Sequence, residues 1–117
     1  MNKELMVHVI TNFAGVGGAE MMLARLIKQT QNEYDHVVIS LMKTSEVYVD
    51  TLAICSSHYA LAWNGLNSFA VIAKLKKLLQ QLAPKTVQCW MYHANVLTSL
   101  SVLGLANKPK VFWGIHH

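Results

Sequence analysis

The stretch Leu5-Met6-Val7-His8-Val9-Ile10, followed by the turn Phe13-Ala14-Gly15-Val16-Gly17-Gly18, decides the fold. The first segment is a β-prone run that ends at polar residues, and the second is a glycine-rich turn of the kind that joins a strand to a helix. Apolar residues then recur with the spacing of a helix that buries one stripe: Ala19, Met22, Leu23, Leu26 and Ile27. Asp35–Leu41 is a β-branched run of strand length. The chain therefore opens with a β-α-β unit.

The remaining sequence repeats this alternation, although residues 42–57 carry only weak patterns and predict at most a short helix around 47–54. We expect three further strands, at residues 58–63, 86–90 and 111–115. Asn67 or Ser68 is placed to cap a helix that Pro84 stops. Its predicted buried stripe is Phe69, Ile72, Leu75, Leu79 and Leu82. A loop at 91–94 and a helix capped by Asn95 and running to Ala106 complete the pattern.

Strands that alternate with helices predict a parallel sheet with right-handed crossovers. We therefore expect an α/β fold, a Rossmann-like doubly wound parallel sheet in three α/β/α layers. The usual strand order of such a sheet is 3-2-1-4-5, and the location of the site below is argued for that order. A length of 117 residues suits one domain, and a composition of 53% hydrophobic and 14% charged residues suits strands that are covered on both faces.

The composition also favours a soluble cytosolic protein. Cys55 and Cys89 lie outside any disulfide or metal-binding spacing, so they are interpreted as reduced structural thiols. The start of the chain resembles a first strand rather than a signal peptide, and no apolar run is long enough to span a bilayer. A strand followed at once by His116-His117 suggests that the sequence stops at a fragment boundary.

In a sheet of this order, ligands bind beyond the carboxyl ends of the strands, at the point where the winding reverses between the first and fourth strands. The loops predicted there are the glycine turn and residues 91–94, which include Tyr92 and His93. Gly15, Gly17 and Gly18 either let a phosphate approach the helix N-terminus or only form a tight turn, and their spacing leaves both options open. His93 is either a sugar-contacting imidazole or a structural residue.

Several other chemistries are disfavoured. Glu20 stands where a dinucleotide fingerprint needs its third glycine, and no Gly-Lys-Ser/Thr follows the turn as a P-loop requires. The six histidines form no spacing typical of a zinc site, and no Gly-x-Ser-x-Gly elbow indicates a hydrolase. We therefore expect no metal cofactor and no hydrolytic triad.

The formal charge of +4 is carried in part by a basic cluster, Lys74, Lys76, Lys77 and Lys85. This cluster is either a solvated helix face or a point of peripheral contact with anionic membrane lipid. Nucleic acid is not an expected partner, because no basic stripe with interleaved aromatic residues is present.

Three segments together resemble the group 1 (family four) retaining glycosyltransferases. The first is Val9-Ile10-Thr11-Asn12-Phe13 with Gly17-Gly18-Ala19-Glu20, the second is Gln88-Cys89-Trp90-Met91-Tyr92-His93-Ala94-Asn95, and the third is Val111–His117. The resemblance covers nearly the whole chain. It implies one half of a GT-B architecture, in which two Rossmann-like domains face a cleft and the first domain mostly binds the acceptor.

The resemblance also implies roles for particular residues. Gly17 and Gly18, with Gly15 and Glu20 in the same turn, would approach the donor diphosphate, and their amides would stabilise charge on the departing nucleotide. His93 would lie near the transferred sugar as the catalytic candidate, with Tyr92 and Asn95 beside it. His116 or His117 would lie on the acceptor side. No metal is required by this family.

The function implied by the resemblance is transfer of a hexose from a nucleotide sugar to a glycan or lipid-linked acceptor, in surface polysaccharide biosynthesis. The family's second, donor-binding domain with its pair of spaced glutamates is absent from residues 1–117, so this chain alone is expected to be inactive. The expected location is the cytoplasm, with the inner face of the membrane as an option. The alternatives are a non-enzymatic nucleotide- or phosphate-binding Rossmann module and a protein-interaction domain.

Overall fold

A single parallel sheet organises the molecule. The computed structural model describes residues 3–15, 17–90, 92–102 and 109–114, without the side chains of 92, 93, 95, 96 and 112–114. The strands are β1 (Glu4–Ile10), β2 (Tyr34–Ser40), β3 (Ser57–Ala60), β4 (Thr86–Trp90) and β5 (Lys110–Gly114). They lie in the order β3-β2-β1-β4-β5, and each neighbouring pair is parallel. The predicted Rossmann-like doubly wound fold and strand order are confirmed.

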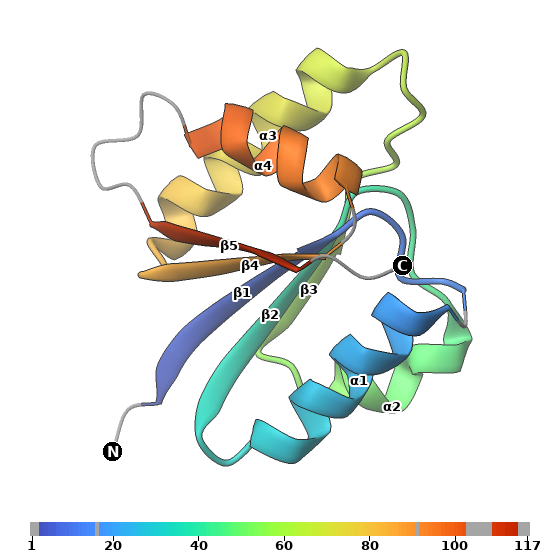
Figure 1. The fold of residues 1–117 in the computed structure, drawn as a ribbon, viewed down its shortest axis with the longest axis vertical. Coiled ribbons are helices and arrows are strands. Elements are labelled where there is room, and N and C mark those ends of the chain that lie inside the picture. Colours follow the sequence, from blue (N-terminus) through green and yellow to red (C-terminus); the bar gives the residue numbers. More distant parts are fainter. Residues whose placement is uncertain (1–2, 16, 91, 103–108, 115–117) are drawn as a thin grey trace.

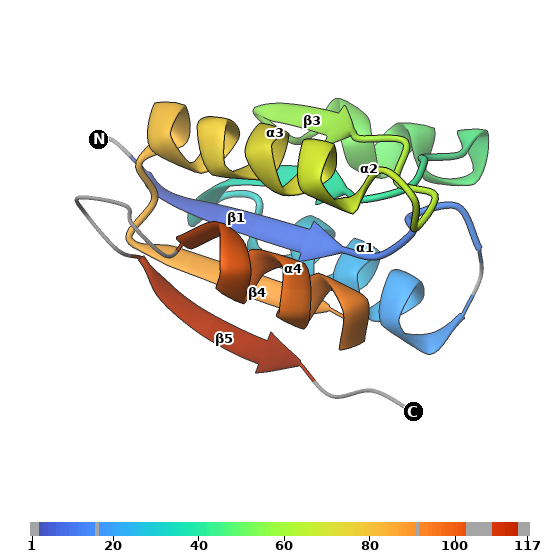
Figure 2. The ribbon, with the colours of Figure 1, turned by 90° about the horizontal axis from the view of Figure 1, so that it is seen from above.

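Helices cover both faces of this sheet. Figure 1 shows α1 (Gly18–Thr30) and α2 (Val49–Ala53) on one face, and α3 (Ser68–Leu82) and α4 (Tyr92–Val102) on the other. A short 3₁₀ turn, η1 (Glu46–Tyr48), precedes α2, so the predicted short helix near 47–54 is confirmed in position. Viewed from above, β3 and β5 form the two edges of the sheet (Figure 2).

The alternation of side chains along each strand divides the core into two parts. Val7 and Val9 of β1 point to the α3–α4 face, where they pack with Val37, Val87 and Leu75. Ile10 lies in the other core, with Leu23 and Ile27 of α1. Because successive strand residues point to opposite faces, β1 contributes to both cores and is covered on each side, as its nearly continuous apolar sequence requires.

The buried stripe of α3 differs from the predicted one. Leu75 and Leu79 are buried as expected, but Val71 completes the stripe, and Phe69 is 90% exposed. Phe69 lies six residues before Leu75 and is therefore about 120° away around the helix axis. In α1 the same kind of shift leaves Met22 46% exposed. Apolar spacing located both helices correctly but did not determine which neighbouring residue faces the sheet.

The capping prediction for α3 is correct in position and wrong in chemistry. Asn67 is the N-cap residue but makes no side-chain capping bond. Its Oδ1 instead accepts a hydrogen bond from the Asn64 amide at 2.9 Å, and Ser68 Oγ donates to the Gly65 carbonyl. These side chains stabilise the preceding loop rather than the helix end.

Two general features follow the sequence expectations. Cys55 and Cys89 are both free, and burial raises the pKa of each thiol to about 11, which suits structural thiols. Among the described helices, none combines the length and hydrophobicity that a bilayer crossing requires.

The observed stripe of α3 predicts a contrast between two substitutions. Leu75→Ala should lower the free energy of unfolding by about 2–5 kcal/mol, because it leaves a cavity at a fully buried position. Phe69→Ala removes a larger side chain but should change the free energy of unfolding by no more than about 0.5 kcal/mol, because Phe69 is exposed. Urea unfolding followed by circular dichroism measures both, and comparable losses would contradict the described helix orientation.

Candidate functional site

The candidate site lies at the carboxyl edge of the sheet, between β1 and β4. A hydrogen bond joins the two sides of this edge: the amide of Ala94, in the first turn of α4, donates to Thr11 Oγ1 at 3.2 Å. Thr11 directly follows β1 and is buried. The ends of β1 and β4 therefore meet at the reversal of winding. Thr11, which precedes the predicted glycine turn and which the sequence analysis did not single out, makes the contact with α4; a contact of the glycine turn itself with residues 92–94 stays a prediction.

The second of these predicted loops is not a loop. α4 begins at Tyr92, so Tyr92 and His93 occupy its first turn and Asn95 is its fourth residue rather than its cap. The helix starts almost directly after Trp90 because the Thr11 hydroxyl binds one of the amides that a helix start leaves unpaired. The side chains of Tyr92, His93 and Asn95 lie outside the described residues, as do His116 and His117 entirely.

The glycine turn has a close neighbour in Glu20. A Cβ atom on Gly15 would lie 2.7 Å from one carboxylate oxygen of Glu20, and one on Gly17 would lie 2.8 Å from the other. Neither glycine has a positive φ, so backbone freedom is not what the turn requires of them. Gly18, by contrast, has no atom within 4 Å of a built Cβ. Gly15 and Gly17 thus give room to a side chain of the same turn.

This placement of Glu20 affects the charge at the site. Its side chain is only 7% exposed, in the first turn of α1, where a negative charge is stabilised by the helix dipole. The positive end of α1 is therefore already partly compensated. The first turn of α4 contains no acidic residue, so its dipole remains available to an external anion.

Residues 40–48 hold the glycine turn in place. The Tyr48 hydroxyl donates to the Gly15 carbonyl, and the Tyr48 ring stacks on Phe13 with centroids 4.1 Å apart. The amide of Phe13 donates to Ser40 Oγ at 3.2 Å. Burial, and then the nearby Glu20 carboxylate, raise the pKa of Tyr48, which keeps the hydroxyl protonated as a donor. The segment with the weakest sequence signal thus supports the site.

One acceptor at this edge lacks a partner. Asn12 Oδ1 is buried and has no hydrogen-bond partner within the described part of the chain. A buried acceptor without a donor costs free energy unless water or a ligand supplies one. Asn12 lies between Thr11, which contacts α4, and Phe13, which packs on Tyr48. It is therefore a second polar group at the candidate site that the sequence analysis did not identify.

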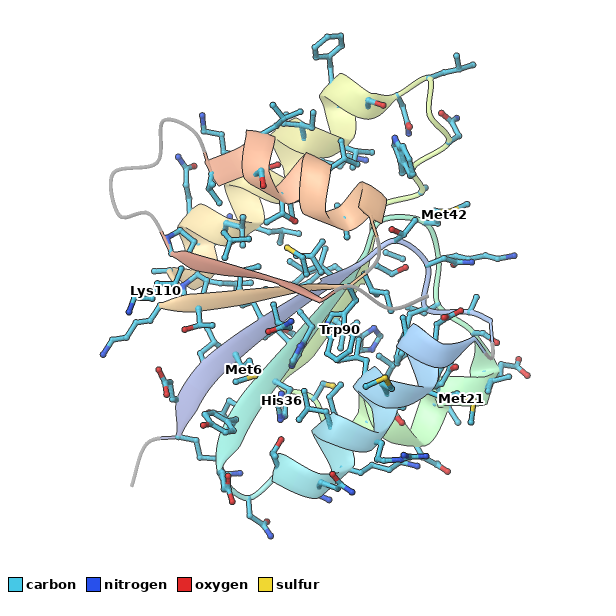
Figure 3. All side chains as sticks on the ribbon, viewed as in Figure 1. Met6, Met21, His36, Met42, Trp90 and Lys110 are labelled. Atoms are coloured by element: carbon cyan, nitrogen blue, oxygen red, sulfur yellow. The ribbon has the colours of Figure 1, made fainter. Side chains whose placement is uncertain are left out.

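A chain of buried hydrogen bonds runs from this edge across the α1 face. The Trp90 indole N–H donates to His8 Nδ1 at 3.2 Å, and His8 Nε2 lies 2.9 Å from His36 Nδ1. His36 Nε2 lies 2.8 Å from Thr30 Oγ1, which donates to the Leu26 carbonyl. Figure 3 shows Trp90 and His36 on the α1 side of the sheet. The network connects three strands to α1.

The bonding pattern fixes the tautomer of each imidazole. An indole N–H only donates, so His8 accepts at Nδ1 and carries its proton on Nε2. His8 therefore donates to His36, whose own proton is on Nε2 and points to Thr30. Each neutral ring uses both of its nitrogens in hydrogen bonds, so neither imidazole has a free lone pair with which to bind a metal. The described residues also contain no cluster of three or more potential metal ligands.

Both imidazoles resist protonation. Burial, with a smaller effect of His36, lowers the pKa of His8 from 6.5 to about 3. Burial, with a smaller effect of the Lys3 charge, also lowers the pKa of His36, against the opposing effects of the Thr30 backbone and the charge of Asp35. A second proton on either ring would also remove an acceptor that the network uses.

An apolar groove lies beside α1. A groove of about 420 Å³ lies between α1 and the 47–51 segment, lined by Met21, Ala24, Arg25, Lys28, Gln29, Val47, Tyr48 and Thr51. None of the residues predicted for the site lines it. The candidate site is therefore defined by converging backbone and polar groups rather than by this groove.

Comparison with known proteins adds no family: neither protein-family models nor curated proteins give a match to this sequence. The resemblance to family four glycosyltransferases thus rests on the quoted segments, and the roles of Gly15, Gly17, Gly18, Glu20 and His93 stay predictions.

The contacts of Glu20 predict different effects for neighbouring glycines. Gly17→Ala should lower the free energy of unfolding by about 1 kcal/mol, because the new methyl group displaces a buried carboxylate. Gly18→Ala should raise it by about 0.5–1 kcal/mol, because alanine favours a helix where nothing obstructs it. In a Glu20→Ala background the cost of Gly17→Ala should largely disappear. Chemical denaturation of the Gly17→Ala, Gly18→Ala, Glu20→Ala and Gly17→Ala/Glu20→Ala variants measures this coupling. An equal cost of Gly17→Ala with Glu20 present and with Glu20 replaced would contradict it.

The imidazole pair predicts a pH dependence of stability. Since the folded state holds both pKa values below the ordinary 6.5, the unfolded state binds more protons below that pH. Stability should therefore be full above pH 6.5 and fall as the pH drops toward 3, by up to about 1.4 kcal/mol per pH unit for each histidine. Urea unfolding between pH 7.5 and 5 measures the slope.

A control for this slope is the exposed His58 on β3. His58→Gln should keep the slope of the parent protein, whereas replacing both His8 and His36 with glutamine should reduce it. Where the double variant does not fold, NMR titration of the imidazole protons of the parent protein gives the same information. Normal titration of His8 near pH 6.5 in the folded state would overturn the prediction.

Proposed function

We propose that this chain is the acceptor-side domain of a retaining glycosyltransferase of the GT-B type, acting on a nucleotide sugar and a glycan or lipid-linked acceptor. The observation that carries the proposal is the Thr11–Ala94 hydrogen bond, which joins the ends of β1 and β4. In doubly wound sheets, this reversal point is where phosphorylated ligands bind. The quoted sequence resemblance assigns its functional residues to the same two segments.

The charge distribution of the site supports a role in stabilising a leaving diphosphate. The N-termini of α1 and α4 both begin at the carboxyl edge, and each presents amides without intrahelical partners. Glu20 compensates one of these ends, and no acid compensates the other. We therefore assign the developing negative charge to the α4 side, with the Gly17–Gly18 amides at the periphery of the diphosphate.

The remaining roles follow the resemblance. His93 would donate to or accept from a hydroxyl of the transferred sugar, with Tyr92 and Asn95 near it, and His116 or His117 would face the acceptor. The unpartnered Asn12 Oδ1 adds an acceptor for a sugar hydroxyl at the same edge. No metal enters this proposal, because helix N-termini and amides supply the positive potential.

Sugar transfer would also need a second domain on the other side of the cleft. Positioning two substrates accounts for much of the rate of such a reaction, and the donor would bind mostly to a partner domain. We therefore expect the chain alone to bind nucleotide sugars weakly and to transfer none.

A non-enzymatic phosphate-binding module is the alternative that one observation favours. The acid-free N-terminus of α4 attracts any anion, whether or not a sugar is attached. A module of this kind would bind inorganic phosphate or a nucleoside diphosphate as well as it binds the corresponding nucleotide sugar.

NMR titration with a panel of nucleotide sugars tests the proposal. We expect weak binding, with the largest chemical-shift changes at the amides of Gly17, Gly18 and Ala94. Thr11→Val should weaken this binding and lower the free energy of unfolding by about 1 kcal/mol, because the Ala94 amide loses its acceptor. Thr86→Val, at the opposite end of β4, should leave binding unchanged.

Three results separate the alternatives. Shift changes confined to the groove between α1 and residues 47–51 would refute the proposed site. Equal affinity for inorganic phosphate, nucleoside diphosphate and nucleotide sugar would favour the binding module. Tight binding by this chain alone would contradict the proposed division of labour between two domains.

A further inference from the structure

The loop between β3 and α3 exposes two large apolar side chains to solvent. Leu66 is 96% exposed and Phe69 is 90% exposed, which are the two highest values among the described large hydrophobic residues. They lie three positions apart, at the tip of the loop and in the first turn of α3. Single exposed apolar residues are common on protein surfaces, but two neighbouring ones that make almost no contact with their own fold indicate an external partner.

This loop is held in one conformation by its own polar groups. Asn64 Oδ1 accepts from the amides of Leu66 and Asn67 at 2.9 and 3.1 Å, and the Asn67 side-chain amide donates to the Ala62 carbonyl. The Trp63 indole donates to Ser68 Oγ. Ala62 has φ of 57°, a left-handed conformation that alanine rarely adopts. The exposure of Leu66 is thus maintained by specific bonds.

Charge is divided sharply along the chain. All six aspartate and glutamate residues lie within residues 1–50, whereas residues 51–117 contain six lysines and no acid. The loop and α3 belong to this acid-free half. Helical spacing puts Phe69, Ala73 and Lys77 on one stripe, at i, i+4 and i+8, and each is exposed. Lys74 is also exposed, and Lys74 and Lys77 both line a groove between α3 and the β3 edge of the sheet.

We propose that Leu66, Phe69 and the exposed lysines Lys74 and Lys77 of α3 form a docking surface for an anionic phospholipid bilayer. Leu66 and Phe69 would enter the boundary between headgroups and acyl chains, and Lys74 and Lys77 would contact anionic headgroups. Charge complementarity selects this occupant, because these residues belong to a stretch of the chain with six lysines and no acid, which matches a continuous layer of negative charge. The inference does not depend on the proposed function.

A comparable apolar surface on the other face of the sheet provides a control. Val47 and Val49 are 62% and 60% exposed, but Glu46 and Asp50 flank them directly in sequence. This surface lies on the α1–α2 face, whereas α3 lies on the opposite face (Figure 1). The two acids and the Arg25 and Lys28 side chains that line the same groove as Val47 offset one another, so this surface should attract an anionic bilayer less than α3 does although its apolar exposure is similar.

Vesicle co-sedimentation of the full 117-residue chain tests the surface. We expect binding to vesicles of phosphatidylcholine with phosphatidylglycerol, little binding to phosphatidylcholine alone, and loss of binding at high salt. The double variant Leu66→Ser, Phe69→Ser should bind roughly tenfold more weakly, as should Lys74→Glu, Lys77→Glu. The matched variant Val47→Ser, Val49→Ser should bind like the parent protein. Circular dichroism checks that each variant is folded.

A fluorescence measurement locates the contact. Phe69→Trp should give an emission blue shift with anionic vesicles and strong quenching by brominated acyl chains, and Val47→Trp should give neither. The proposal is overturned by any of these results: no binding to anionic vesicles, equal weakening by the Val47 and Val49 substitutions, or no quenching at position 69. Loss of self-association or of RNA binding in the Leu66 and Phe69 variant, with vesicle binding unchanged, would also overturn it.

Discussion

Right-handed crossovers from a central strand constrain everything else in this molecule. β1 pairs with β2 on one side and β4 on the other, so the helices that follow β1 and β4 pack on opposite faces of the sheet. Both helices nevertheless start at the same edge, because all the strands are parallel. The Thr11–Ala94 hydrogen bond forms at this edge, and the candidate site exists because of this geometry.

The buried hydrogen-bond network around His8 also follows from the central position of β1 in the sheet. β1 is covered on both faces, so His8 has no access to water and its hydrogen bonds must be made within the protein. Trp90 and His36 supply them, and Thr30 bonds the second nitrogen of His36, so that the chain runs in one direction from donor to acceptor. The network connects the end of β4 to α1, and a neutral state of both imidazoles is required for it.

The surface is organised by a division of charge. Acidic residues, including Glu20 at the start of α1, belong to the first half of the chain, and the second half carries only lysines. Because α1 and α2 lie on one face and α3 on the other, this sequence bias gives the two faces different electrostatic character. The same bias leaves the N-terminus of α4 without a compensating acid.

Sequence patterns predicted the larger elements well and some individual residues poorly. The spacing of Leu75 and Leu79 located α3, and four-residue steps from these residues lead back to Val71, which is buried, whereas Phe69 lies about 120° away from Leu75 around the helix. Residues 42–57 gave little signal because their order comes from tertiary contacts, such as Tyr48 on Phe13 and Gly15. Asn95 was predicted as a cap because local propensity does not reveal the Thr11 hydroxyl that binds an α4 amide.

By itself, the sequence determined the class of fold, because apolar periodicity and crossover handedness are local and general rules. The strand order was assumed as the usual one for that class, and the structure has this order. Only the tertiary structure decided three features: Glu20 fills the space beside Gly15 and Gly17, His8 and His36 belong to one chain of hydrogen bonds, and Leu66 and Phe69 face solvent. The histidine pair depends on a contact between residues far apart in the chain, and the other features depend on how the glycine turn and α3 are oriented on the sheet, which apolar periodicity does not encode.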